Sequence, residues 1–170
     1  MYKTLILDRD GVINHVCSNY VKSISELYII PSSIKAINYA IRHELEVVVA
    51  SNQAGIGKKL FEEDVLKKIN NEINKKLIKN IEFYYCKHTV EDNCACRKPK
   101  PGLLNKIINE TNPPHIFIGD NYTDIMAAKA ACIDAALVLT GHGQRFSNMI
   151  PENVPIYKNL ECFINSIFKA

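Results

Sequence analysis

The chain has 170 residues, of which 47% are apolar and 23% charged, and its formal net charge at pH 7 is +3. This length suits one domain with its own hydrophobic core, and the composition excludes an intrinsically disordered chain. The apolar runs are too short to cross a membrane, the N-terminus has no export signal, and the dispersed lysines disfavour a nucleic-acid-binding surface. We therefore expect a single cytoplasmic domain over residues 1–170, monomeric, with neither a membrane nor a nucleic acid as partner.

Short apolar runs alternate along the chain with longer stretches that have the apolar spacing of helices. The predicted strands span residues 3–7, 46–50, 81–85, 115–118 and 135–139, with a sixth, edge strand at 155–157. The predicted helices lie near residues 32–43, 62–79, 101–110, 122–131 and 159–168. This alternation predicts an α/β fold in three layers, in which helices cover both faces of a parallel, Rossmann-like sheet. The segments between the strands are too short for a second folded domain, so no cap is expected.

Polar and charged residues follow four of the predicted strands. They are Asp8 and Asp10 after the first, Ser51 and Asn52 after the second, Arg97 and Lys98 in the loop after the third, and Asp120 and Asp124 after the fourth. Each segment alone has an ordinary explanation, such as an Asp-Gly turn or a helix cap. Together they indicate a ligand site, because ligands of open parallel sheets bind beyond the carboxyl ends of the strands. The two-residue period of a strand turns Asp8 and Asp10 toward this site and Arg9 away from it.

Converging carboxylates at this edge imply a bound cation. At about 4 Å and an effective dielectric near 20, each pair of like charges repels by roughly 4 kcal/mol. Because the stability of a whole domain is only about 5–15 kcal/mol, a cluster of Asp8, Asp10 and Asp120 needs a counter-ion. Oxygen ligands with room for water and phosphate favour Mg²⁺.

A second candidate metal site precedes Arg97 and Lys98. Four residues with the spacing C-x-H-x5-C-x-C form it: Cys86, His88, Cys94 and Cys96. A Cys3His set suits tetrahedral Zn²⁺, and four protein ligands leave no open position, so this zinc would be structural. It would stiffen a long loop and aim the two cations at a phosphate, and its thiolates need a reducing compartment. Three further thiols are expected to be buried or half-buried: Cys17, Cys132 and Cys162.

Four motifs, in order, resemble the signatures of the haloacid dehalogenase (HAD) superfamily of aspartate-nucleophile phosphatases. They are DRDGV at the first strand, Ser51 after the second, the lysine of RKPKP, and GDNYTD after the fourth. The resemblance spans nearly the whole chain and implies a HAD-like fold and Mg²⁺-dependent hydrolysis of a phosphomonoester. Asp8 would form an aspartyl phosphate, and Asp10 would protonate the leaving oxygen and later deprotonate water. Asp8, Asp120 and the backbone carbonyl of Asp10 would hold Mg²⁺, while Ser51 and Lys98 would hold phosphoryl oxygens.

Within the superfamily, the zinc loop beside DRDGVIN resembles a small capless group that contains heptose 1,7-bisphosphate 7-phosphatases and histidinol-phosphate phosphatases. The segments NYVKSISELYIIP, SNQAGIG and RKPKPGLL resemble the heptose enzymes. This implies removal of the 7-phosphate of D-glycero-D-manno-heptose 1,7-bisphosphate, a step of carbohydrate metabolism toward ADP- or GDP-heptose and bacterial lipopolysaccharide or surface polysaccharide. The five-residue spacer between His88 and Cys94 instead resembles the histidinol-phosphate enzymes, whose substrate stays the alternative.

The same resemblance implies which residues contact the phosphorylated metabolite. They are Tyr20 with the preceding Ser18 and Asn19, the segment Asn52, Gln53 and Ala54, and Asn121. Asn121 stands where the heptose group usually has lysine, which removes one cation near the phosphate. The planar fork of Arg97 is then the expected contact to a second phosphate or a sugar hydroxyl. Asp124 is expected to brace the site rather than to touch the metal.

Two other classes of protein share parts of this pattern. A phospho-accepting receiver domain also places acids, a hydroxyl and a lysine on a parallel sheet, but its acceptor Asp follows the third strand, where this chain has the cysteine loop. A non-catalytic zinc module that binds nucleic acid or protein would leave the acids structural. Such a module predicts that Asp8→Asn keeps function intact, whereas an enzyme predicts lost turnover in a folded protein. His15 and His142 are expected to be surface or packing residues.

Overall fold

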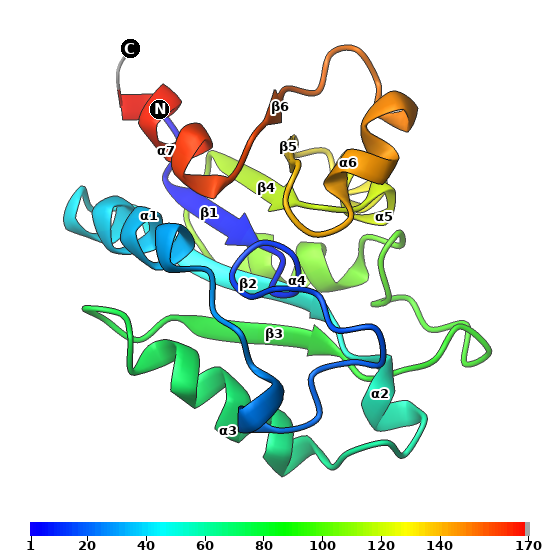
Figure 1. Cartoon of the computed structure of the whole chain (residues 1–170). Helices are drawn as coiled ribbons and strands as arrows, with labels where there is room; N and C mark the ends of the chain where they lie inside the picture. Colours follow the sequence, from blue (N-terminus) through cyan, green and yellow to red (C-terminus); the bar gives the residue numbers. More distant parts are fainter. Residues whose placement is uncertain (169–170) are drawn as a thin grey trace.

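The strands of the sheet all run in the same direction (Figure 1), in a computed structural model that describes residues 1–168. Their order is β3-β2-β1-β4-β5-β6, and every neighbouring pair is parallel. The strands are β1 (Thr4–Leu7), β2 (Glu46–Asn52), β3 (Glu82–Cys86), β4 (His115–Gly119), β5 (Asp134–Val138) and β6 (Ile156–Tyr157). The strand order reverses beside β1, which pairs with β2 on one side and β4 on the other. Such a switch point is where open α/β sheets bind ligands.

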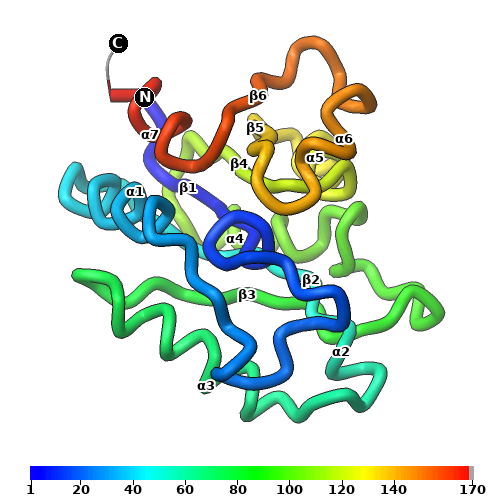
Figure 2. The backbone as a smooth tube through the Cα atoms, in the orientation of Figure 1, coloured from blue at the N-terminus to red at the C-terminus, as the bar shows by residue number. Residues whose placement is uncertain are grey.

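Helices cover both faces of the sheet, which confirms the predicted three-layer architecture. They are α1 (Pro31–Arg42), α2 (Ala54–Gly57), α3 (Glu63–Asn74), α4 (Gly102–Glu110), α5 (Tyr122–Ala130), α6 (Gly143–Phe146) and α7 (Leu160–Phe168), with 3-10 turns η1 (Ile24–Glu26) and η2 (Ser147–Met149). In Figure 2, α1 lies in front of the strands and α4 behind them, while α3 runs along β3 and α7 lies beside the start of β1. Residues of α1, α3 and α7 pack in one core, on one face of the sheet. The short elements α2, α6, η1 and η2 were not predicted, because three or four residues show no apolar period.

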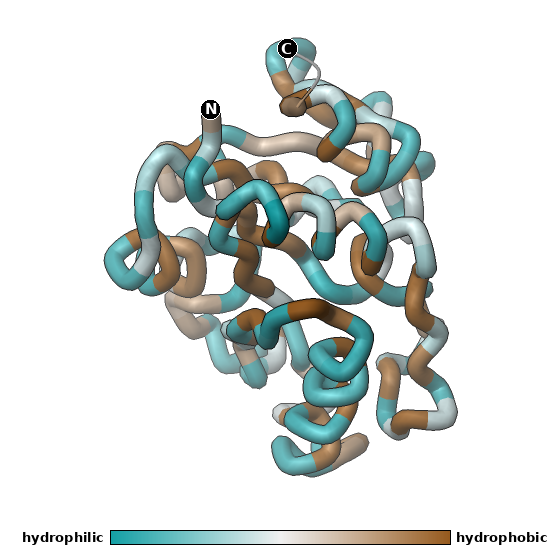
Figure 3. Tube along the Cα trace, turned by 90° about the vertical axis from the view of Figure 1, so that its left-hand side faces the viewer, coloured by the Kyte–Doolittle hydropathy of each residue, from teal (hydrophilic) through white to brown (hydrophobic). Residues whose placement is uncertain are grey.

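Side chains that alternate along each strand build two hydrophobic cores. Leu5 and Leu7 of β1 pack in the core that α1, α3 and α7 cover, whereas Ile6 packs in the core beneath α4 and α5. Burial on both sides explains why the strands are nearly continuous apolar runs. Figure 3 shows hydrophilic and hydrophobic segments alternating along the helices, as expected for amphipathic helices on a sheet.

Helix α3 shows this amphipathic pattern and one difference from the prediction. Its buried residues recur at helical spacing: Leu66, Ile69, Asn70 and Ile73. The helix ends at Asn74 rather than near residue 79. The Asn74 side chain donates to the Ile81 carbonyl at 3.2 Å and accepts from the Ile81 N–H at 3.0 Å, so it binds the turn that leads into β3.

Two further details differ from the sequence analysis. Strand β2 runs two residues further than predicted, because Ser51 and Asn52 continue the pairing with β3. Cys132 and Cys162 are exposed rather than buried or half-buried, and Cys17 alone of the three scattered thiols is half-buried. No helix within residues 1–168 is long and apolar enough to cross a membrane.

Candidate active site

The carboxyl ends of β1, β2 and β4 border a cavity of about 530 Å³. The predicted residues that line it are Asp8, Asp10, Ser18, Asn19, Tyr20, Ser51, Asn52, Arg97, Lys98, Asp120, Asn121 and Asp124. A larger cavity of about 620 Å³ lies at the other end of the strands, beside Glu46 and Glu82, the first residues of β2 and β3. The smaller cavity combines buried carboxylates with a buried lysine, so we place the candidate active site there.

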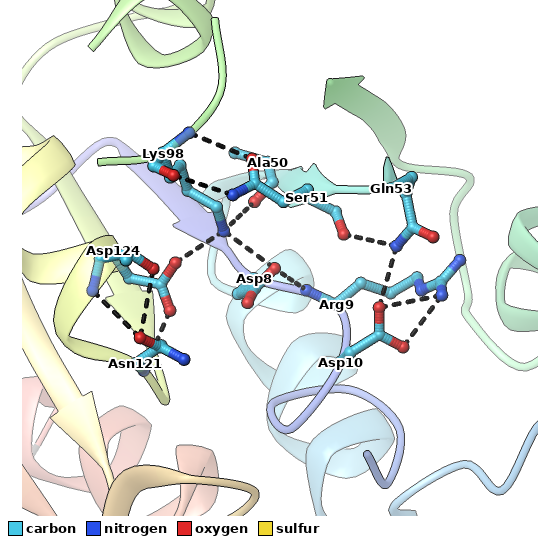
Figure 4. Close-up of polar contacts among 11 residues, drawn as sticks. Asp8, Arg9, Asp10, Ala50, Ser51, Gln53, Lys98, Asn121 and Asp124 are labelled. Atoms are coloured by element: carbon cyan, nitrogen blue, oxygen red, sulfur yellow. Dashed lines mark hydrogen bonds and ion pairs between the residues drawn. The ribbon is translucent and has the colours of Figure 1, made fainter. Parts of the chain in front are cut away.

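Lys98 lies between two carboxylates at this site (Figure 4). Its Nζ is 3.0 Å from Asp8 Oδ1 and 2.7 Å from Asp124 Oδ1, and it donates to the Ala50 carbonyl at 2.9 Å. These contacts match the three N–H groups of an ammonium. Burial alone would lower the pKa of Lys98, but the charges of Asp124 and Asp8 raise the pKa well above its ordinary value. Lys98 is therefore a fixed cation beside Asp8.

Asp8, Asp120 and Asp124 bring their carboxylates together. Each offers an oxygen within 4.8 Å of the others, and all three side chains are buried. Burial raises the pKa of Asp8 to about 7 against the opposing charge of Lys98, and burial with the charges of Asp8 and Asp124 raises the pKa of Asp120 to about 8. Asp8 and Asp120 therefore retain protons near neutral pH unless a further cation joins the cluster. Oxygen donors are the ligands that Mg²⁺ prefers, so this donor set fits the predicted ion.

Two loops close on the carboxylate of Asp120. The backbone N–H of His142 donates to Asp120 Oδ2 at 2.6 Å. Gly11 and Gly141 both have left-handed backbones, with φ of +88° and +59°, and a Cβ on either would overlap Asp120 Oδ2. Glycine is therefore required at both positions. This contact could not be predicted from the sequence, because a TGHG segment indicates a turn but not the side chain that the turn meets.

Asp10 has surroundings unlike those of Asp8. Both of its carboxylate oxygens lie 2.9 Å from Arg9 Nη2, and they also accept hydrogen bonds from Asn14 Nδ2 and Gln53 Nε2, each at 2.9 Å. Arg9 is 1% exposed and does not line the cavity, so it points away from the site as expected and contacts Asp10 from behind. Burial opposes ionisation, but Arg9, Asn14 and Gln53 hold the pKa of Asp10 below its usual value.

Ser51, Asn52 and Gln53 follow one another but have different environments. Ser51 lines the cavity, and its hydroxyl accepts from Gln53 Nε2 at 2.7 Å. The Asn52 amide binds the backbone of Lys98 in both directions, accepting from its N–H and donating to its carbonyl, each at 3.1 Å. Gln53 was predicted to contact substrate, but it is 1% exposed and does not line the cavity. We correct its role: Gln53 orients Asp10 and Ser51 from behind.

Further polar side chains line the cavity beyond the acidic cluster. Arg97 donates to the His88 carbonyl at 3.4 Å, and the side chain of Asn121 accepts the Thr123 N–H at 3.1 Å as the N-cap of α5. Lys58 and His142 also line the cavity, although neither was predicted to do so. The short helix α2, which the sequence does not reveal, places Lys58 there, with its Nζ 5.4 Å from the centre of the Tyr20 ring.

The predicted metal ligands of the cysteine loop come together. Cys96 Sγ lies 3.3 Å from Cys86 Sγ and 3.5 Å from Cys94 Sγ, and Cys86 Sγ lies 3.6 Å from Cys94 Sγ. His88 Nδ1 is 3.3 Å from the sulfur of Cys96. Four soft donor atoms at these separations could hold one metal ion.

Comparison with known proteins decides the family. A model of the HAD-hydrolase-like family matches residues 95–157. The D-glycero-beta-D-manno-heptose-1,7-bisphosphate 7-phosphatase of Neisseria meningitidis is 34% identical to this chain, over 98% of this chain and 95% of its own length. The enzyme of the same name from Pseudomonas aeruginosa is 35% identical over 97% of both chains. The chain belongs to this family of HAD phosphatases.

A solved structure of this HAD phosphatase family has nearly the same fold. The D,D-heptose 1,7-bisphosphate phosphatase of B. bronchiseptica, complexed with magnesium and phosphate, superposes with a TM-score of 0.92 at 30% identity and covers 98% of both chains. Membership of the family confirms the HAD-like fold that DRDGV, Ser51, RKPKP and GDNYTD predicted. It also makes the chain a phosphatase, which excludes the receiver domain and the non-catalytic zinc module.

Proposed function

We propose that this phosphatase removes the 7-phosphate of D-glycero-D-manno-heptose 1,7-bisphosphate with the help of Mg²⁺, in a pathway toward ADP- or GDP-heptose for lipopolysaccharide or surface polysaccharide. One observation carries the chemistry: Asp8 meets Asp120 within 4.8 Å and Lys98 at 3.0 Å beside an open cavity. The cavity volume of about 530 Å³ lies in the range of small-molecule sites, which suits a sugar bisphosphate. The assignment of this substrate rests on the names of the relatives.

Asp8 is the proposed nucleophile. Its carboxylate oxygen attacks the phosphorus, the bond from phosphorus to the sugar oxygen breaks, and an aspartyl phosphate forms. Water then attacks the same phosphorus, which releases phosphate and restores Asp8. Asp10 lines the same cavity, and we assign to it the proton that the leaving oxygen takes and the proton that the attacking water loses.

Charge on the phosphoryl oxygens is balanced by donors that face the cavity. Asp8, Asp120 and the backbone carbonyl of Asp10 would hold Mg²⁺, which would supply positive charge to the phosphoryl oxygens. Ser51 binds a phosphoryl oxygen, and Lys98 binds another with the N–H that points to Asp8 in the free protein, while Asp124 holds Lys98 in place. We therefore assign to Asp124 the bracing role that the sequence also predicts.

The second phosphate of the substrate needs its own cation. Arg97 and Lys58 line the cavity, and a guanidinium and an ammonium both bind phosphate well. We assign the 1-phosphate to these two side chains, with Tyr20, Asn52 and Asn121 near the sugar.

The cysteine loop is proposed to hold a structural Zn²⁺. A tetrahedron with Zn–S bonds of about 2.3 Å has sulfur–sulfur edges of about 3.8 Å. The sulfur separations in the loop, 3.3 to 3.6 Å, are close to that value. His88 completes a closed set of four ligands, so the ion would fix the loop that carries Arg97 and Lys98.

We also infer that the chain works as one phosphatase domain over residues 1–170, as a monomer in the cytoplasm, on a small metabolite. The sheet and its helices occupy residues 1–168 with no inserted cap among them. A site built on thiolates favours a reducing compartment.

A substrate panel tests the proposed function. Phosphate release is measured from heptose 1,7-bisphosphate and from histidinol phosphate, with Mg²⁺ added or omitted. We expect kcat/KM to be more than about tenfold higher for the heptose, equivalent to at least 1.4 kcal/mol of transition-state discrimination. A tenfold preference for histidinol phosphate would overturn the substrate, and turnover without Mg²⁺ would overturn the chemistry.

A further inference from the structure

Arg9 is a charged residue buried behind the active site. Its side chain is 1% exposed, and it ranks among the largest fully buried side chains of residues 1–168. A guanidinium keeps its charge at every physiological pH, so its burial requires a counter-charge. Asp10 supplies it, with both carboxylate oxygens 2.9 Å from Arg9 Nη2.

Arg9 cannot contact the substrate itself. It does not line the cavity, whereas the neighbouring Asp8 and Asp10 both do. Figure 4 shows the guanidinium on the side of Asp10 that faces away from Asp8 and Lys98. Any part that the Arg9 side chain takes in the reaction therefore passes through Asp10, whereas its backbone N–H donates to Asp8 Oδ1 at 2.8 Å.

The second terminal nitrogen of the Arg9 guanidinium contacts helix α3. Arg9 Nη1 donates to Asn70 Oδ1 at 3.4 Å. Asn70 is a polar residue on the otherwise apolar buried face of α3 and is 7% exposed. A polar residue at such a position destabilises a helix interface unless it has a partner, and Arg9 is that partner.

The hydrogen-bond network that Arg9, Asn14 and Gln53 form around Asp10 leaves some buried polar atoms unpaired. Arg9 Nε and Gln53 Oε1 are both buried without a hydrogen-bond partner. Buried polar groups in native proteins are nearly always paired, so an exception calls for an explanation. The need to orient Asp10 explains these unpaired atoms, because Arg9, Asn14 and Gln53 together fix both of its carboxylate oxygens.

We propose that Arg9, anchored by Asn70, is a positioning residue that holds the Asp10 carboxyl group where it exchanges protons with the reacting oxygens. This inference rests on the proposed mechanism. In the first step the oxygen of Asp8 bonds to phosphorus, the ester bond to the leaving oxygen breaks, and that oxygen takes a proton from Asp10. Asp10 is ionised in the free protein and receives this proton from the phosphate monoanion of the bound substrate. In the second step the oxygen of water bonds to phosphorus, the bond from phosphorus to the oxygen of Asp8 breaks, phosphate leaves, and the water gives one proton to Asp10.

The test uses leaving groups of different quality. An alkyl phosphate needs a proton on its leaving oxygen, whereas p-nitrophenolate leaves without one. For Arg9→Met we expect kcat/KM for the alkyl phosphate to fall about 10²-fold or more, and kcat/KM for p-nitrophenyl phosphate to fall less than about threefold. Because the second step still needs Asp10, Arg9→Met should also release a burst of p-nitrophenolate, one equivalent per enzyme.

Other variants separate positioning from folding. Arg9→Lys keeps the buried cation, and we expect it to regain most of the alkyl phosphate activity that Arg9→Met loses. Asn70→Leu, which removes only the anchor, should show a weaker loss with the same dependence on leaving group. The exposed Arg42→Met serves as the matched control with unchanged kinetics.

Three results would overturn the inference: equal losses for both leaving groups, unchanged kcat/KM for the alkyl phosphate in Arg9→Met, or no recovery in a folded Arg9→Lys. The alkyl phosphate is the one that the wild-type enzyme cleaves fastest in the substrate panel. The comparison of leaving groups is therefore valid even if the assigned substrate is wrong. A failure of the substrate assignment can thus be told apart from a failure of the Arg9 inference.

Discussion

The ammonium of Lys98 and the carboxylate of Asp124 lie 2.7 Å apart, and both side chains are buried. Asp124 is itself fixed, because its Oδ2 accepts the Asn121 N–H at 3.1 Å in the first turn of α5. The N-terminus of α5 therefore determines where Lys98 points. This relationship links the GDNYTD segment to the lysine of RKPKP, which are separate motifs in the sequence.

Removal of the Asp124 charge should impair catalysis. In Asp124→Asn, Lys98 keeps its ion pair with Asp8 but loses its ion pair with residue 124, so the direction of the ammonium is no longer fixed. We expect kcat to fall about 10²-fold, the scale on which small misplacements of catalytic groups act. Steady-state phosphate release measures kcat. Asp64→Asn, whose side chain is 83% exposed, is the matched control; an active Asp124→Asn would show that Asp124 does not brace Lys98.

Stability in the absence of Mg²⁺ should decrease as pH rises. Burial and neighbouring charges raise the pKa of Asp8 to about 7 and that of Asp120 to about 8 in the folded protein, whereas an unfolded Asp titrates near 3.9. The folded state then binds more protons than the unfolded chain, so the free energy of unfolding falls between about pH 4 and pH 8.

Thermal melts at several pH values above 5 check this dependence. Mg²⁺ is omitted rather than chelated, because a chelator would also remove a metal from the cysteine loop. We expect the melting temperature to decrease toward pH 8 and added Mg²⁺ to restore it most at high pH. A melting temperature that rises with pH in Mg²⁺-free buffer would contradict the raised pKa values.

Loss of one thiolate should release the zinc ion that we propose for the cysteine loop. In Cys96→Ser we expect zinc to drop from about one ion per chain to well below one, with reduced stability, since structural metal binding contributes folding free energy. Activity should fall as well, because Arg97 and Lys98 directly follow the altered ligand. Elemental analysis measures the zinc content, and phosphate release measures the activity. Cys162→Ser, a change at an exposed thiol, is the control. Full activity in zinc-free Cys96→Ser would show that the metal of the loop does not affect the active site.

A side chain at Gly141 should displace the Asp120 carboxylate. The new Cβ of Gly141→Ala would overlap Asp120 Oδ2, and the left-handed φ of +59° adds strain. We expect weaker Mg²⁺ binding, seen as a higher Mg²⁺ concentration for half-maximal activity. Asn148→Ala, a change at an exposed residue of η2, should keep the wild-type value. Unchanged Mg²⁺ dependence in Gly141→Ala would show that Asp120 is not held as described.

Much of the site could be predicted from the sequence because strand ends carry its chemistry. Apolar runs locate the strands, and in a parallel sheet their carboxyl ends meet at one edge, which brings Asp8, Ser51 and Asp120 together. What could not be predicted depends on side-chain direction and on short elements. The inward turn of Gln53 and the placement of Lys58 by α2 leave no periodic signal.

The central claim is that Asp8 is the nucleophile within a cluster of like charges, and turnover together with stability in Asp8→Asn tests it most directly. We expect kcat to fall about 10³-fold or more. In Mg²⁺-free buffer at pH 8 the melting temperature should rise, because one buried carboxylate has been removed. An inactive but stabilised protein would support the account. Phosphatase activity close to wild type in folded Asp8→Asn would contradict it.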